Sequence, residues 1–178
     1  MMMRRHPQVL RKAKTTVLIV GEGATEKAFL DHLKSHYVTR GCGVSVTTRN
    51  AHGKGPENVV DVAIRNSKGA DYTIVAALMD TDLPWSPSLR KSARSKKICL
   101  VGASPCGDGL LLRILGDHVP AESAQCKEKL IERLGSKPVL PDVYRRDFTK
   151  ALLDGQRGAI ESLDKLLNLM AGTRPVSD

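Results

Sequence analysis

Three acidic residues stand just after two of the most apolar segments of the chain. Glu22 comes after the segment Thr15–Val20, and Asp80 and Asp82 come after the segment Tyr72–Met79. Carboxylates that share one place repel each other unless a cation binds among them. Because carboxylate oxygens are hard ligands, the cations that suit them are Mg²⁺ and Mn²⁺. The three residues therefore form a candidate divalent-metal site.

Each acid also has an ordinary structural explanation. Glu22 and Glu26 lie where a helix is expected to begin, and the helix N-terminus favours an acid by a few tenths to about one kcal/mol. Asp80 and Asp82 are residue types that form turns, because Asp accepts a hydrogen bond from the backbone two residues on. Three acids at two strand ends together favour metal binding, whereas Glu26 stays open between a ligand and an acid that is simply favoured in the first turn of the helix.

Short apolar segments and helical patterns alternate along the first two thirds of the chain. Strands are expected over 15–20, 44–48, 72–79 and 98–101, and helices over 25–37, 57–66 and 86–95. Such an alternation predicts an α/β domain with a Rossmann-like, mostly parallel central sheet flanked by helices. In open parallel sheets, ligands collect at the carboxyl ends of the strands.

The positions of these acids follow from that architecture. If the two acid-bearing strands are neighbours, Glu22 and Asp80 meet at one edge of the sheet. Asp82 projects to the same side as Asp80 if the strand geometry continues through Thr81.

Beyond residue 105 the pattern becomes mainly helical. Helices are expected over 110–115, 121–134, 148–153 and 159–170, and Pro138 and Pro141 indicate a loop. The chain shows no internal repeat and no domain linker. We expect a basic arm over 1–14 and one domain over 15–178, with a core of 15–118 and a helical extension of 119–178.

The composition indicates a soluble globular protein. Of 178 residues, 41% are hydrophobic and 26% are charged. No apolar run approaches the roughly 18 residues of a membrane span, and the basic N-terminus lacks the apolar stretch of a secretory signal. We expect a cytoplasmic protein without a membrane partner. The four cysteines form no C-x-x-C pair, which favours reduced structural thiols over a zinc site or disulfides.

The net charge of +9 is concentrated in two places. Residues 1–14 and residues 86–97 each carry five basic residues and no acid, and the rest of the chain carries 18 basic and 19 acidic residues. Basic patches of this kind suit a nucleic-acid backbone, because each Lys or Arg releases condensed counterions from the phosphates. A solubilising surface and a frayed chain end are the alternatives.

Several residues near the acids are candidates for contacting nucleic acid. Lys54, in a glycine-rich loop, is either a phosphate contact or an ordinary exposed lysine. Trp85 either stacks on a base or packs over the sheet edge. A basic face of the helix 86–95 would bring a phosphate chain to the metal, unless it is simply solvated, and at 100° per residue this face comprises Arg90, Lys91, Arg94 and Lys97.

Four segments together resemble Toprim domains. Residues 17–30 (VLIVGEGATEKAFL) resemble the first Toprim motif, an apolar strand followed by Glu-Gly, and their Thr-Glu and Phe-Leu resemble the RloB and OLD-nuclease branch. Residues 78–82 (LMDTD) resemble the Asp-x-Asp motif. Residues 55–60 (GPENVV), and Ser-Pro-Cys at 104–106 followed by the leucines at 110–112, resemble further RloB-like segments. The resemblance covers about residues 15–118.

The segment that begins with Ser-Pro-Cys at 104–106 corresponds to the third motif of the family, and it departs from the family pattern. RloB-like chains usually have Phe-Glu after the Pro-Cys and a His about six residues beyond. Here Gly107 and Asp108 take the first two positions, and Ile114 takes the place of the His. Asp108 keeps an acid, shorter by one methylene, so the change bears directly on catalytic competence.

The resemblance implies a Toprim fold and Mg²⁺-dependent phosphodiester chemistry. Glu22, Asp80 and Asp82 would be the catalytic and metal-holding residues, with Glu22 also a general acid or base. Glu26 or Asp108 would help to hold a second ion. Relatives of the RloB type often act beside a separate ATPase in antiphage defence, which makes an ATPase a possible partner here.

Two functions from different classes follow. The first is a Mg²⁺- or Mn²⁺-dependent nuclease acting on DNA or RNA. The second is a catalytically degenerate Toprim-like module that binds nucleic acid or a partner protein. A receiver- or phosphatase-like domain with Asp80 as nucleophile is disfavoured, because later strand ends show no obvious Thr or Ser with a Lys.

Overall fold

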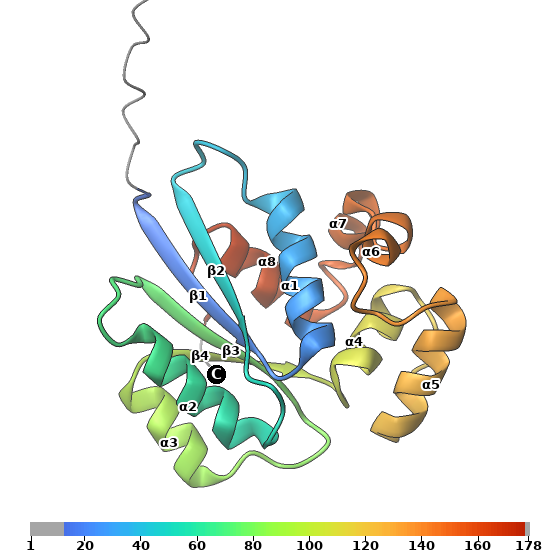
Figure 1. Ribbon diagram of the computed structural model, residues 1–178, viewed down its shortest axis with the longest axis horizontal. Helices are drawn as coiled ribbons and strands as arrows, with labels where there is room; N and C mark the ends of the chain where they lie inside the picture. Colours follow the sequence, from blue (N-terminus) through green and yellow to red (C-terminus); the bar gives the residue numbers. More distant parts are fainter. Residues whose placement is uncertain (1–12, 177–178) are drawn as a thin grey trace, which may run out of the picture.

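Four parallel strands form the centre of the molecule (Figure 1). The computed structural model describes residues 13–176. Most of the basic arm predicted over 1–14 therefore lies outside the described residues. The strands are β1 (Thr15–Gly21), β2 (Val44–Asn50), β3 (Ile74–Asp80) and β4 (Ile98–Ala103), in the order β2-β1-β3-β4.

Helices cover both faces of this sheet. One face carries α1 (Ala24–Tyr37), α4 (Gly107–Ile114) and α8 (Glu161–Met170), and the other carries α2 (Gly55–Ser67) and α3 (Pro87–Ser95). The predicted α/β class and the parallel sheet flanked by helices are thus confirmed. The expected strand and helix positions also agree, with shifts of a few residues at their ends.

Alternating side chains of the strands build two apolar layers. Val17 and Ile19 of β1 pack into the core under α1 and α4, whereas Leu18 and Val20 pack into the core under α2 and α3. Successive strand residues point to opposite faces, so a strand buried on both sides must be apolar throughout. This requirement explains the unbroken apolar runs of β1 and β3.

The remaining helices extend the larger of the two cores. They are α5 (Ser123–Leu134), α6 (Pro141–Asp147) and α7 (Lys150–Gln156), which pack beside α1 and α4. The loop predicted around Pro138 and Pro141 is wrong in part, because Pro141 begins α6. Proline is favoured in the first helical turn, where its missing N–H has no partner to lose.

The chain changes direction across the sheet between β1 and β3. From β1 the chain first adds β2 on one side, then crosses back to add β3 and β4 on the other. Open α/β sheets bind ligands at such a switch point, outside the carboxyl ends of the strands. Within residues 13–176, no helix is both long and apolar enough to cross a bilayer.

Candidate functional site

Glu22 and Asp80 meet at the switch point. Gly21, the last residue of β1, lies opposite Leu78 in the parallel register with β3. Glu22, the residue that follows β1, is therefore nearly level with the end of β3. The backbone N–H of Asp80 donates a hydrogen bond of 3.1 Å to Oε2 of Glu22. These two acids, which are separated by 58 residues in the sequence, thus lie side by side as expected.

The Asp80 carboxylate lies between strand and helix. Its Oδ1 accepts a hydrogen bond of 2.9 Å from the backbone N–H of Gly107, at the beginning of α4. Burial, followed by the negative charges of Glu26 and Glu22, raises the pKa of Asp80 to about 7. The negative charge of this carboxylate is thus only partly compensated by the Gly107 N–H.

Glu26 both caps α1 and belongs to this acidic group. Its Oε2 accepts a hydrogen bond of 2.9 Å from the backbone N–H of Gly23 and so caps the helix. The side chain is nonetheless buried, and it rests against Gly107, where a Cβ would lie 1.8 Å from Oε1. Burial raises the pKa of Glu26, and the charges of Asp108 and Glu22 add to that effect.

Asp82 makes its hydrogen bonds outside the pair, although its negative charge still contributes to the raised pKa of Asp80. The strand does not continue through Thr81, because β3 ends at Asp80 and the Thr81 N–H donates to the carbonyl oxygens of Ala103 and Pro105. The Asp82 carboxylate instead accepts hydrogen bonds from its neighbour Leu83, at 2.9 Å, and from the Ser123 hydroxyl of α5, at 2.8 Å. Ser123 had no sequence signal that linked it to this site.

Asp108 lies in the first turn of α4. Among residues 13–176 its buried Oδ1 has no hydrogen-bond partner, and burial raises the pKa of Asp108. A buried acceptor without a donor costs about 1–3 kcal/mol if it stays unpaired. Ile114, four residues past Leu110, is fully buried in the core, so no polar group stands at that position.

These donors fit a divalent ion in part. Residues 13–176 contain no group of three or more His, Cys, Asp or Glu side chains already arranged to hold a metal. Glu22 and Asp80, however, each use only one carboxylate oxygen in hydrogen bonds within this part of the chain. Hard oxygens next to a carboxylate with a raised pKa suit Mg²⁺ or Mn²⁺. A third ligand from Asp82 requires its side chain to leave Ser123.

The glycine-rich loop adjoins Glu22 through its backbone. The Gly53 N–H donates a hydrogen bond of 2.8 Å to the carbonyl oxygen of Glu22. Lys54 follows with a left-handed φ of 70°, and its side chain is exposed just before α2 begins. The structure thus places Lys54 near the acidic group without a direct contact to it.

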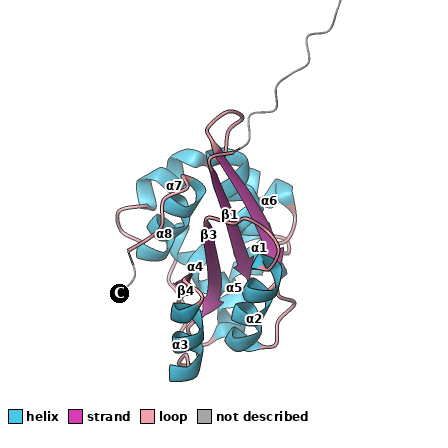
Figure 2. Cartoon of the chain, turned by 90° about the vertical axis from the view of Figure 1, so that its left-hand side faces the viewer, coloured by secondary structure: helices cyan, strands magenta, loops and turns pink. Residues whose placement is uncertain are grey.

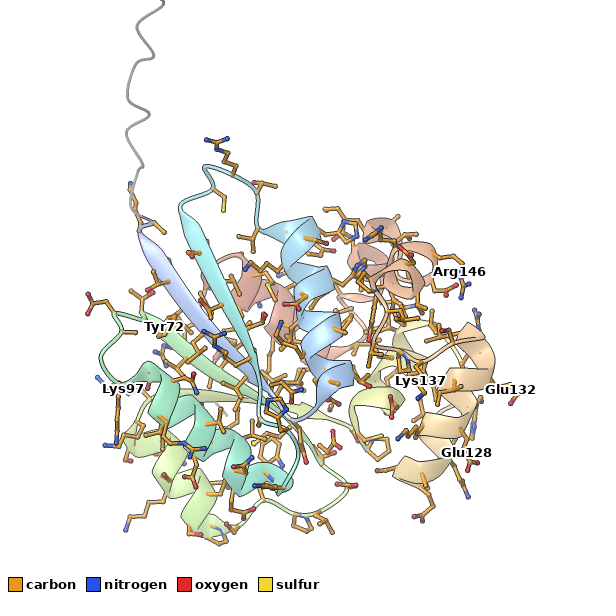
Figure 3. The ribbon with its side chains drawn as sticks, viewed as in Figure 1. Tyr72, Lys97, Glu128, Glu132, Lys137 and Arg146 are labelled. Carbon is orange, nitrogen blue, oxygen red and sulfur yellow. The ribbon has the colours of Figure 1, made fainter. Side chains whose placement is uncertain are left out.

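The basic face of α3 divides into two sets. Arg90, Arg94 and Lys97 line a groove beside β4, whereas Lys91 is exposed and does not. Figure 3 shows Lys97 on the opposite side of the view from Glu128 and Glu132 of α5.

Trp85 packs at the edge of the sheet, as one alternative expected. Its ring lies beside Gly102 of β4, and Arg90 stands over it at 5.2 Å from the ring centroid. Its indole N–H donates a hydrogen bond of 2.8 Å to the backbone oxygen of Asp80. Trp85 therefore ties the α3 segment to the acidic site.

Comparison with protein-family models, with curated proteins and with solved structures found no match for this chain.

Proposed function

We propose that this protein is a Mg²⁺- or Mn²⁺-dependent nuclease of the Toprim type. The observation that carries the proposal is the pairing of Glu22 and Asp80 at the switch point of the sheet. The order of the motif-like segments, with Glu-Gly after β1 and Asp-x-Asp after β3, supports the assignment of this pair to a Toprim site.

Glu22 and Asp80 would hold the ion, and Asp82 would join them after release from Ser123. An ion held there would supply Lewis-acid chemistry, that is, polarisation of a phosphoryl oxygen and a lower pKa for an attacking water. Glu22, only partly buried, can exchange a proton with that water or with the leaving oxygen. Lys54, exposed beside Glu22, supplies positive charge for the phosphorane as it forms.

A second candidate is a non-catalytic Toprim-like module that binds nucleic acid or a separate ATPase. The observation that favours it is the state of two motif residues. Asp82 is held by Ser123 at 2.8 Å, and the buried Ile114 replaces a polar residue of the third motif. Such a module would retain its binding surface but would not cleave phosphodiester bonds.

Cleavage of single- and double-stranded DNA and RNA with Mg²⁺ or Mn²⁺ separates these candidates. For a nuclease, Asp80→Asn should lower the rate by about a hundredfold or more, because a metal ligand and its charge are lost. The exposed Asp71, which precedes β3 at the other end of the strand, is a matched control: Asp71→Asn should cleave at the wild-type rate.

The opposite result supports the module. In that case the folded wild type cleaves none of the substrates, alone or with added ATPase, and binds nucleic acid equally well as Asp80→Asn. Equal metal-dependent cleavage by wild type and Asp80→Asn would contradict the proposed site itself.

A further inference from the structure

A groove runs along the outer edge of β4. It has a volume of about 540 Å³ and a floor formed by residues of β4 from Ile98 to Gly102. Figure 2 shows β4 between α3 and α8, with the C-terminal segment beside them. Because β4 is the last strand of the sheet, this edge has no further strand beside it within the described chain.

The groove is strongly basic. Its lining includes one acid, Glu161, and five cationic side chains, which are Arg90, Arg94, Lys97, Lys165 and Arg174. Glu161 is paired with Lys165 at 2.6 Å. The cations from α3 and its end have no carboxylate partner within residues 13–176. An anionic ligand would therefore meet little competition for them.

Three separate segments hold these cations in place. Arg90 and Arg94 are one turn apart on α3, which separates their Cβ atoms by about 5–6 Å. Lys97 follows the helix with a left-handed φ of 54°. From the opposite side, Arg174 donates a hydrogen bond of 2.9 Å to the backbone oxygen of Lys97. A row of positive charges thus follows the groove and is closed at one end by the C-terminal segment.

The other end of the groove leads to the acidic site. Trp85 and Gly102 line that end, and Trp85 donates its indole N–H to the backbone oxygen of Asp80 at 2.8 Å. Gly102 lies opposite Met79, one residue before Asp80, in the register of β3 and β4. A linear ligand in the groove would therefore be directed toward the carboxyl ends of the strands.

We infer that this groove binds the phosphate backbone of a single nucleic-acid strand and guides it past Trp85 toward Glu22 and Asp80. A positively charged groove that follows the phosphate backbone is a usual means of binding a single strand. A groove walled by two helices suits one strand better than a duplex, whose second strand would meet α3 or α8. Guidance of the strand toward Glu22 and Asp80 rests on the proposed nuclease function, whereas binding of the strand in the groove does not.

Fluorescence anisotropy with labelled oligothymidylate and oligouridylate tests this inference. The measurement is made in EDTA, so that binding is observed without cleavage. The variant Arg90→Ala/Arg94→Ala removes two groove cations. Its matched control, Lys91→Ala/Lys96→Ala, removes two cations of the same segment that do not line the groove. A duplex of equal length and an acidic peptide serve as alternative ligands.

We expect the groove variant to lose about tenfold or more in affinity for single strands, and its slope of log K against log salt to fall by roughly one unit or more. The control variant should lose less than about threefold, from the general field alone. Equal losses in both variants would overturn the inference. So would tighter groove-dependent binding of the duplex or of the acidic peptide.

The two proposals can fail separately. If single strands bind through the groove but no metal-dependent cleavage occurs, the groove proposal stands and the nuclease proposal fails. If instead Asp80→Asn abolishes metal-dependent cleavage but Arg90→Ala/Arg94→Ala does not weaken binding, the nuclease proposal stands and the groove proposal fails.

Discussion

Asp80 experiences opposing influences in the folded protein. The Gly107 N–H stabilises its negative charge, whereas burial and the nearby Glu26 and Glu22 destabilise it, so that its pKa rises to about 7. A carboxyl whose pKa is higher in the folded than in the unfolded state binds its proton more tightly when folded. Its contribution to stability is therefore greatest at low pH and declines as the pH rises from the ordinary Asp range to about 7.

The variant Asp80→Asn should remove this dependence. Without metal at pH 8, we expect it to be more stable than wild type by about 1–3 kcal/mol, a range already reduced for the partial exposure of Asp80. At pH 5 the advantage should be clearly smaller, because Asp80 is then protonated in the folded wild type although still largely ionised in the unfolded chain. Chemical denaturation in EDTA at several pH values measures the difference.

Comparing the two proteins also isolates Asp80 from other titrating groups. Burial lowers the pKa of His32, which by itself makes the folded state less stable as the pH falls below the ordinary His range. That effect is common to both proteins and cancels in the difference. If the difference in unfolding free energy between wild type and Asp80→Asn is the same at pH 5 and pH 8, the claim that burial and nearby carboxylates raise the pKa of Asp80 is wrong.

At the level of elements, the joint between α1 and α4 depends on a glycine. Gly107 begins α4, and a Cβ there would lie 1.8 Å from Oε1 of the buried Glu26 on α1. We expect Gly107→Ala to destabilise the protein by about 1–3 kcal/mol, because Glu26 or α4 must move. The free energy of unfolding, obtained by denaturant titration, measures this cost.

Two further variants show whether the contact is responsible. In the Glu26→Ala background the cost of Gly107→Ala should shrink, because the clashing carboxylate is gone. Apart from its chain neighbours and the backbone of its own helix, no atom of residues 13–176 lies within 4 Å of a Cβ built on Gly155 of α7, so Gly155→Ala should instead stabilise by roughly 0.5–1 kcal/mol. An unchanged cost of Gly107→Ala beside Glu26→Ala would place the strain elsewhere.

The elements themselves could be predicted because their signals are local. A strand buried on both faces must be apolar throughout, and this made β1 and β3 visible in the sequence. The meeting of Glu22 and Asp80 followed from one further rule, that ligands bind at the carboxyl ends of strands. The short helix α6 was missed because its seven residues begin at Pro141, in a segment that resembles a loop.

The remaining features depend on segments that are distant in sequence. Asp82 is bound by Ser123, 41 residues away, and no local pattern links the two. Lys165 and Arg174 reach the groove beside β4 only because α8 and the C-terminal segment pack there. Side-chain direction also mattered: Lys91 belongs to the predicted basic face but does not line the groove.

At the scale of the whole molecule, the part of the chain beyond residue 118 contributes to both candidate surfaces. Its α5 holds Asp82 through Ser123, and its α8 and C-terminal segment form one wall of the basic groove. The molecule thus places an acidic site at the carboxyl ends of its strands and a basic path along β4. This separation of charge would keep the cations proposed to bind phosphate from neutralising the carboxylates proposed to hold metal.

The central claim is that Glu22 and Asp80 together bind a divalent ion, and titration with Mn²⁺ followed by electron paramagnetic resonance tests it most directly. We predict that the wild type binds Mn²⁺ at pH 8 and about tenfold more weakly at pH 6, where a proton competes for Asp80. Asp80→Asn and Glu22→Gln should bind at least about tenfold more weakly than wild type at pH 8, and Asp71→Asn should bind equally well. Wild-type affinity retained in Asp80→Asn and Glu22→Gln, or no Mn²⁺ binding by the wild type at pH 8, would contradict the account.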